Sequence, residues 1–129
     1  MIDTSAVAAI LFGEPDARTF SEAIEAAPTR LISAVTRAEL SFVVEGRKQE
    51  AARADLESLL DRAEFEVVAA TPRHAEIAIE AFRRFGRGRH AAGLNICDCF
   101  AYALAIALDE PLLFKGDDFG QTDVKSALG

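Results

Sequence analysis

The stretch FEVVAATP, residues 65–72, decides the fold class, because an extended segment passes there directly into a helix start. Val67 and Val68 are β-branched residues in a short apolar run, which predicts a strand over 65–69. Thr71 followed by Pro72 has the form of a helix cap with a first-turn proline. A strand that leads into a helix in this way is the repeating unit of α/β proteins.

The same alternation extends in both directions along the chain. Short apolar segments at 1–3, 30–33 and 112–114 are expected to be strands. Helices are expected over the remaining patterned stretches, at 5–12, 15–27, 34–45, 49–63, 72–85 and 94–108. Parallel strands joined by helices form a sheet that is covered on both faces. We therefore predict one α/β domain over residues 1–129, with a small parallel sheet of four or five strands flanked by helices.

The amino-acid composition limits the classes of function that this chain can have. Of the 129 residues, 50% are hydrophobic and 27% are charged, which is typical of a single globular domain. The formal net charge of −7 excludes a general nucleic-acid coat and disfavours an anionic membrane surface. The apolar run 94–108 contains two polar residues and is shorter than the roughly 20 residues that span a bilayer. With no signal-peptide pattern and with Cys97 and Cys99 pointing apart on a helix, we expect a cytoplasmic protein with reduced thiols.

Five acidic residues stand out by their sequence context: Asp3, Glu39, Asp98, Asp117 and Asp118. Asp98 is the one charged residue between Gly93 and Asp109, and an unpaired buried carboxylate is costly. Glu39 shares a helical stripe with Phe42, which predicts that it points toward the core side. Structural roles are open for each acid: a helix cap for Asp3, capping boxes for Thr36–Glu39 and Asn95–Asp98, and a turn for the last two.

Together these acids favour a metal site. The ends of parallel strands, and the helix starts that follow them, lie at one edge of a doubly wound sheet. Carboxylates gathered at that edge raise one another's pKa unless a cation lies between them. Mg²⁺ prefers oxygen ligands, and the sequence has no His-rich or Cys-rich spacing typical of zinc sites. We therefore predict a Mg²⁺ or Mn²⁺ site at this edge.

Several blocks of the sequence resemble one known family. They are MIDTSA at 1–6, RAEL at 37–40, GRHAAGLNICDC at 88–99, LLFKGDDF at 112–119 and TDV at 122–124. In this order they resemble the PIN-domain family, in particular its VapC-type ribonuclease toxins of bacterial type II toxin–antitoxin systems. The chain departs from the family pattern at its start, where relatives carry one or two more apolar residues before the first Asp. A native start upstream of Met1 is one explanation.

The resemblance implies a Mg²⁺-dependent endoribonuclease that hydrolyses RNA phosphodiesters. It places the acidic site at Asp3, Glu39, Asp98 and either Asp117 or Asp118. Asp3 and Asp98 are the expected direct metal ligands, and the other acids would bind directly or through water. Supporting roles beside these acids are expected for Thr4, Ser5 and Asn95.

RNA binding by a chain of net charge −7 needs a local group of cations. The densest basic stretch precedes the Asp98 helix, and the expected RNA contacts are Arg87, Arg89, His90 and Lys115. Arg83 and Arg84 have the alternative of a solvated helix end, where cations are favoured.

The resemblance also implies partners: a cognate VapB-type antitoxin, a second copy in a homodimer, and a larger toxin–antitoxin assembly. The helices at 6–12 and 17–27 are candidate docking surfaces, with ordinary core packing as the alternative. Two alternative functions compare with this one. A PIN-like scaffold would bind RNA or a partner without catalysis, and a receiver-like signalling domain would need an Asp after its central strand, where residues 67–71 have none.

Overall fold

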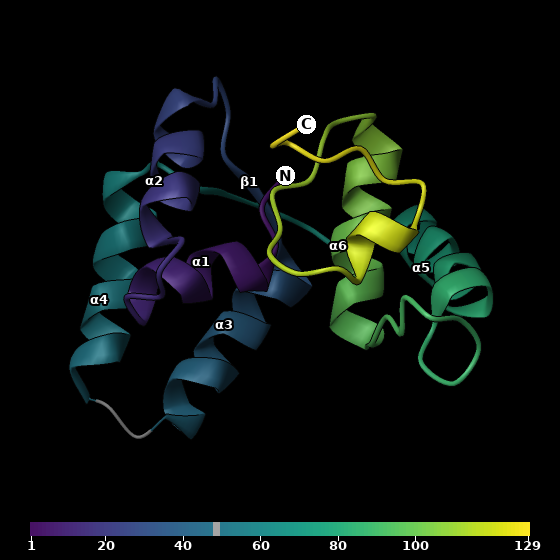
Figure 1. The fold of residues 1–129 in the computed structure, drawn as a ribbon, viewed down its shortest axis with the longest axis horizontal. Helices are drawn as coiled ribbons and strands as arrows, with labels where there is room; N and C mark the ends of the chain where they lie inside the picture. Colours follow the sequence, from purple (N-terminus) through teal and green to yellow (C-terminus); the bar gives the residue numbers. More distant parts are fainter. Residues whose placement is uncertain (48–49) are drawn as a thin grey trace.

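A computed structural model of the chain describes residues 1–47 and 50–129. The elements follow one another as α1 (Thr4–Leu11), α2 (Ala17–Ala26), β1 (Leu31–Ser33), α3 (Ala34–Gly46), α4 (Glu50–Arg62), β2 (Glu66–Val68), α5 (Pro72–Phe85), α6 (Ile96–Leu108) and the short 3₁₀ helix η1 (Phe119–Gln121). Figure 1 shows α1 to α4 on one side of the molecule and α5 and α6 on the other, with extended segments between them. The α/β class predicted from the sequence is confirmed.

The sheet is parallel, as predicted, and β1 pairs with β2 in the register Leu31 opposite Glu66 and Ser33 opposite Val68. The strand predicted over 65–69 is therefore present as β2. Thr71 caps α5 by accepting a hydrogen bond from the His74 amide at 3.2 Å, and the proline occupies the first turn. The local pattern that predicted the fold class is confirmed in both its strand and its helix start.

The predicted size of the sheet was wrong. In the described residues, 1–47 and 50–129, the sheet has two strands instead of four or five. Segments 1–3 and 112–114 lie beside it in extended form, where a single parallel bridge joins Ile2 to Leu113. The pairing stops after one step because the chain bends at Asp3 to begin α1 directly.

Backbone hydrogen bonds nevertheless place these extended segments side by side. The Ile2 amide donates to the Leu31 carbonyl at 3.0 Å, and the Asp3 amide donates to the Leu113 carbonyl at 2.9 Å. Segment 1–3 therefore lies between β1 and segment 112–114. This arrangement brings the start of the chain, the start of α3 and the C-terminal region to one edge.

Two groups of buried side chains hold these segments from either side. The first comes mainly from α1 to α4 and includes Val7, Phe20, Ile24, Leu40 and Leu56. The second comes mainly from α5, α6 and the C-terminal region and includes Ala81, Leu94, Tyr102, Leu112 and Phe119. The apolar faces of α1 and α2, which were candidate docking surfaces, thus belong to the first core. Among the described residues, no helix is long and apolar enough to cross a membrane.

Candidate metal centre

Four acidic side chains come from four different elements to the edge where the extended segments end. Asp3 precedes α1, Glu39 lies in α3, Asp98 lies in the first turn of α6, and Asp118 precedes η1. They influence one another electrostatically: after burial, the carboxylates of Asp3 and Asp118 both raise the pKa of Asp98. The structure thus brings together four of the five acids predicted from the sequence.

Asp3 is held in one orientation by Ser5. It caps α1, and its Oδ2 accepts hydrogen bonds from the Ser5 amide at 3.0 Å and the Ser5 hydroxyl at 2.7 Å. The residue is only 3% exposed, and its other oxygen, Oδ1, is buried without any hydrogen-bond partner. Burial raises the pKa of Asp3 above its usual value, although the hydrogen bonds from Ser5 oppose that change. The cap and the site acid predicted for this residue are therefore compatible, because each uses a different oxygen.

Glu39 is supported by the residue next to Asp3. The Thr4 hydroxyl donates a hydrogen bond to Glu39 Oε1, which joins the first turn of α1 to α3. The capping box predicted for Thr36 and Glu39 was wrong, because α3 begins earlier and Ser33 caps it by accepting from the Val35 amide at 3.2 Å. Glu39 is therefore free of a capping role and lies against α1.

Asp98 forms the capping box that its sequence context suggested. Asn95 and Asp98 form a capping box: the Asp98 amide donates to Asn95 Oδ1 at 2.8 Å, and the Asn95 amide donates to Asp98 Oδ2 at 3.0 Å. This arrangement uses only one Asp98 oxygen. Burial, together with the charges of Asp3 and Asp118, raises the pKa of Asp98 to about 6, while the Asn95 hydrogen bond and the Arg87 guanidinium act in the opposite direction.

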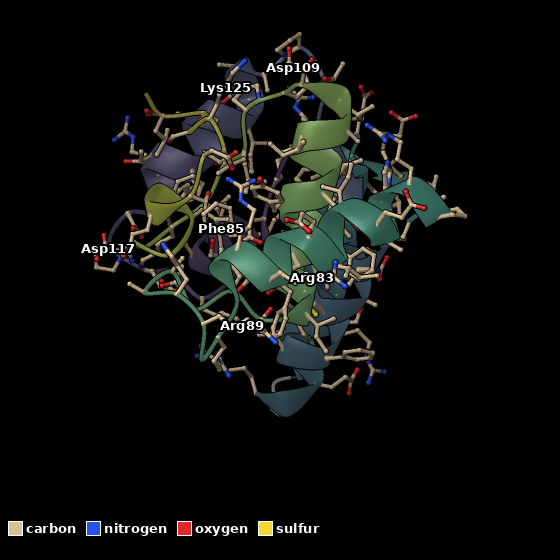
Figure 2. The ribbon with its side chains drawn as sticks, turned by 90° about the vertical axis from the view of Figure 1, so that its right-hand side faces the viewer. Arg83, Phe85, Arg89, Asp109, Asp117 and Lys125 are labelled. Atoms are coloured by element: carbon tan, nitrogen blue, oxygen red, sulfur yellow. The ribbon has the colours of Figure 1, made fainter. Side chains whose placement is uncertain are left out.

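The two neighbouring acids before Phe119 differ in their surroundings. Asp118 is the one whose charge acts on Asp98. Both acids are exposed, and Asp117 lies at the periphery of the molecule in Figure 2. Its backbone carbonyl accepts a hydrogen bond from the Gln121 amide group at 3.3 Å. The influence of its charge on Asp98 favours Asp118 over Asp117 as the fourth acid of the centre.

Sequence reasoning assigned Cys97 to packing and missed its position beside the acids. Burial, followed by the carboxylates of Glu39, Asp98 and Asp3, raises the pKa of the Cys97 thiol to about 11. Both Cys97 and Cys99 are free thiols, as predicted. The sequence did hold one signal for this position. Cys97 directly precedes Asp98, and neighbouring residues on a helix lie on adjoining parts of its surface.

Lys115 was predicted as an RNA contact, and the structure places its ammonium group elsewhere. The Lys115 side chain pairs with Glu14 and with Asp16, the latter at 3.0 Å, in the connection between α1 and α2. Its backbone amide donates to the Ser5 hydroxyl at 2.9 Å. Since Ser5 in turn donates to Asp3, Lys115 links the C-terminal region to the first acid.

The other predicted RNA contacts lie in the exposed loop between α5 and α6. Arg87 is close enough to lower the pKa of Asp98. Arg89 extends from the loop beneath α5 in Figure 2, with its guanidinium 5.9 Å from the centre of the Phe82 ring. His90 organises the loop itself, because its Nδ1 accepts from the Ala92 amide at 3.0 Å and its ring packs edge-on against Phe85 at 5.3 Å.

The donor set of this centre fits a hydrated divalent cation. The orphaned Oδ1 of Asp3 is a buried acceptor with no donor, which is unfavourable unless a cation or a proton satisfies it. Within the described part of the chain, no three His, Cys, Asp or Glu side chains come close enough together to hold one ion directly. Mg²⁺ suits such an arrangement because it takes one or two carboxylates and keeps several waters.

Comparison with known proteins identifies the family. The sequence profile of the PIN domain matches residues 1–125. The chain belongs to the PIN domain family. This match covers both cores and every acid of the centre, so the family assignment applies to the whole described fold.

Several relatives of this PIN domain are named ribonucleases. It is 46% identical over 124 residues to Ribonuclease VapC30 of Mycobacterium tuberculosis (strain ATCC 25618 / H37Rv), covering 96% of this chain and 95% of that protein. It is 44% identical over 129 residues to Ribonuclease VapC28 of the same strain, covering 99% and 97%. It is also 46% identical over 124 residues to Ribonuclease VapC of Mycolicibacterium smegmatis (strain ATCC 700084 / mc(2)155), covering 96% of each chain.

Proposed function

We propose that this PIN domain is a metal-dependent endoribonuclease and the toxin of a VapC-type toxin–antitoxin pair. Its identity of 44–46% over nearly the full length of proteins named VapC ribonucleases supports the reaction class. The single structural observation that carries the proposal is Asp3, whose Oδ1 is buried, unpaired and at the edge shared with Glu39, Asp98 and Asp118.

Asp3 and Asp98 are the proposed direct ligands of Mg²⁺ or Mn²⁺. Each has one oxygen fixed by a hydrogen bond from its own helix start, which leaves the second oxygen for the ion. The donors, the Ser5 hydroxyl and the Asn95 amide, are neutral, so each carboxylate keeps its negative charge for the ion. Fixing a ligand through its second oxygen is the way that surrounding residues usually orient a metal site.

The remaining acids have complementary roles in the proposed mechanism. The chemistry that a bound ion supplies is activation of a water molecule and stabilisation of charge on the phosphodiester. Glu39, held by Thr4, would orient that water or accept its proton. Asp118 would complete the acidic shell from the C-terminal side. Asp117 is left as a surface residue in this assignment.

The substrate proposed for the site is RNA, drawn in by cations beside the acids. Arg87 is the primary candidate because its guanidinium already acts on Asp98. Arg89 and His90 extend the exposed loop and would contact phosphates farther along the strand. Lys115 is engaged by two carboxylates, so any contact with RNA would compete with Glu14 and Asp16.

Cleavage of single-stranded RNA tests the proposed function. The wild-type protein should cleave the RNA internally with Mg²⁺, should lose activity with EDTA, and should recover it when Mg²⁺ is restored. Asp98→Asn keeps the capping acceptor and removes the charge, so it should bind RNA and cleave at least about a hundredfold more slowly. Equal cleavage in all conditions would contradict the proposal. RNA binding without cleavage would instead indicate a non-catalytic PIN scaffold.

We propose an antitoxin as the macromolecular partner, with its docking surface on the outer side of α2 and α4. A pocket there is lined by side chains of both helices, including Ser21, Glu25, Asp55, Ser58 and Arg62. The buried faces of α1 and α2 are core and are not available for docking. Co-expression with the cognate antitoxin should protect this pocket from hydrogen exchange, and Ser58→Arg should weaken the complex.

A second copy is the proposed partner of the groove between α5 and α6. Ile79 is 53% exposed and Ile96 is 71% exposed, and the groove between them is also lined by Phe82 and Phe100. Contiguous apolar surface of this kind marks interaction sites. Light scattering should give a dimer mass for the wild type and a monomer mass for Ile96→Glu. A monomeric wild type would contradict this part of the proposal.

A further inference from the structure

The hydroxyl of Tyr102 fastens the C-terminal region to α6. Tyr102 is 3% exposed and donates a hydrogen bond to Asp123 Oδ1 at 2.6 Å. Arg84 approaches the other carboxylate oxygen, with its Nη2 at 3.4 Å from Oδ2. Burial and the neighbouring Asp123 raise the pKa of Tyr102 to about 12, so the phenol remains a donor at neutral pH. A buried phenol bonded to a surface carboxylate is thus the one polar anchor we find between the described tail and the middle of α6.

The position of Tyr102 on α6 relates this anchor to the metal centre. Residues four positions apart on a helix lie on the same face, one turn apart. Tyr102 is therefore one turn beyond Asp98, and Asp123 is bound beside that next turn. Asp118 directly precedes Phe119, which is buried in the same core as Cys99 and Tyr102, so Asp118 lies beside the first turns of α6. The segment 118–123 thus runs along α6 with one end at the metal centre and the other at Tyr102.

The segment between these two ends is held by its own hydrogen bonds and by a buried phenylalanine. The Gln121 amide donates to the Asp118 carbonyl at 3.2 Å, which closes η1. The Thr122 hydroxyl donates to the Phe119 carbonyl at 2.7 Å, and Phe119 is buried against Phe114 with ring centres 5.4 Å apart. A displacement at Asp123 would therefore be transmitted to Asp118 instead of being absorbed between them.

We propose that Tyr102 and Asp123 are positioning residues for the metal centre, because they fix the register of segment 118–123 against α6 and so hold Asp118 toward Asp98. This inference rests on the proposed function in one respect, namely that Asp118 contributes to a metal site. Neither Tyr102 nor Asp123 is expected to touch the ion or the RNA. The competing explanation is that the hydrogen bond only stabilises the fold.

Mn²⁺ affinity distinguishes the two explanations, because it is measured on folded protein well below the unfolding temperature. Tyr102→Phe removes only the hydroxyl, and Asp123→Asn removes only the charge, so the two variants test the contact from both sides. By calorimetry and water-proton relaxation, we expect each to weaken Mn²⁺ binding by about fivefold to tenfold. In RNA cleavage, each should raise the Mg²⁺ concentration needed for half-maximal rate while leaving the KM for RNA unchanged.

A double-mutant cycle with Asp118→Asn is the decisive arm. If Tyr102 acts through Asp118, then Tyr102→Phe should cost no further Mn²⁺ affinity once Asp118→Asn is present. Lys125→Gln is the matched control, since Lys125 pairs with Asp109 at 3.1 Å and joins the tail to the opposite end of α6, as Figure 2 shows. That variant should bind Mn²⁺ like the wild type.

The possible outcomes separate cleanly. Lower thermal stability with unchanged Mn²⁺ affinity in Tyr102→Phe and Asp123→Asn would overturn the positioning role and leave the proposed function intact. Additive losses with Asp118→Asn would overturn it as well, because the two residues would then act independently. Failure of the wild type to bind Mn²⁺ would contradict the proposed metal site itself, and the inference would fall with it.

Discussion

Ser5 holds Asp3 through two groups at once: its amide and its hydroxyl both donate to Asp3 Oδ2, at 3.0 and 2.7 Å. The hydroxyl also accepts from the Lys115 amide at 2.9 Å, so the first acid and the C-terminal region share one small side chain. Because both bonds fall on Oδ2, the buried Oδ1 is left for another ligand. The proposed metal site depends on this division between the two oxygens.

Replacing Ser5 by alanine should therefore affect both stability and metal binding. The variant loses two side-chain hydrogen bonds and leaves the Lys115 amide without its acceptor, which should lower the free energy of unfolding by about 1–3 kcal/mol. A less constrained Asp3 should weaken Mn²⁺ binding by about tenfold. Urea denaturation and calorimetry measure the two effects. Ser21→Ala, at an exposed position on α2, is the control and should change neither.

In the metal-free protein, Asp98 should contribute stability that grows as the pH falls toward 4. Asp98 has a pKa of about 6 in the folded protein, above its usual value of 3.8, so the folded state binds a proton more tightly than the unfolded state. The stabilisation is complete below pH 4 and is lost as the pH rises through 6. At pH 7, Asp98→Asn should therefore be more stable than the wild type by about 1–3 kcal/mol, measured by urea denaturation in EDTA. If Asp98→Asn is instead less stable across the whole pH range, burial and the neighbouring carboxylates do not destabilise ionised Asp98.

Asp117 and Asp118 provide a matched pair of substitutions. Both are exposed, but Asp118 acts electrostatically on Asp98, whereas Asp117 lies at the periphery of the molecule. We expect Asp118→Asn to weaken Mn²⁺ binding and slow RNA cleavage by at least about tenfold, and Asp117→Asn to change both by less than about twofold. Titration calorimetry and cleavage assays compare the two variants directly. The reverse order of effects would assign the fourth acid to Asp117.

Arg87→Ala should weaken RNA binding in a salt-dependent way. Loss of one phosphate contact lowers the slope of log affinity against log salt by about one, whatever the RNA sequence. The measurement is RNA affinity of the Asp98→Asn protein by fluorescence anisotropy over a range of salt concentrations, so that cleavage does not interfere. Arg18→Ala, which removes an exposed partner of Glu22 on α2, is the control and should leave the slope unchanged. An unchanged slope for Arg87→Ala would remove this residue from the RNA surface.

The sequence predicted the helices and the two paired strands well, because their signals are local. The cap at Thr71 and the Asn95–Asp98 capping box depend only on spacing within one turn, and both are present. Sheet size depends on how far neighbouring segments stay extended. Asp3 turns into α1 after one bridge, and no local pattern shows where such pairing ends.

Side-chain direction was harder to predict than secondary structure. The helical stripe predicted that Glu39 and Phe42 both face the core side; Glu39 is half-buried, but Phe42 is 73% exposed. The Thr4 hydrogen bond places Glu39 against α1, and this contact between distant segments has no signal in either one alone. Lys115 shows the same limit, because its pairing with Glu14 and Asp16 arises only when the C-terminal region reaches α1.

The central claim is that Asp3 and Asp98 hold a divalent cation through the oxygens that their helix starts leave free. The most direct measurement is a crystal of the protein soaked in Mn²⁺, with data collected near the manganese absorption edge. We predict an anomalous peak in contact with Asp3 Oδ1 and an Asp98 oxygen, and no such peak in crystals of Asp98→Asn. If the wild-type crystal at saturating Mn²⁺ shows only water beside Asp3 and Asp98, the account is contradicted.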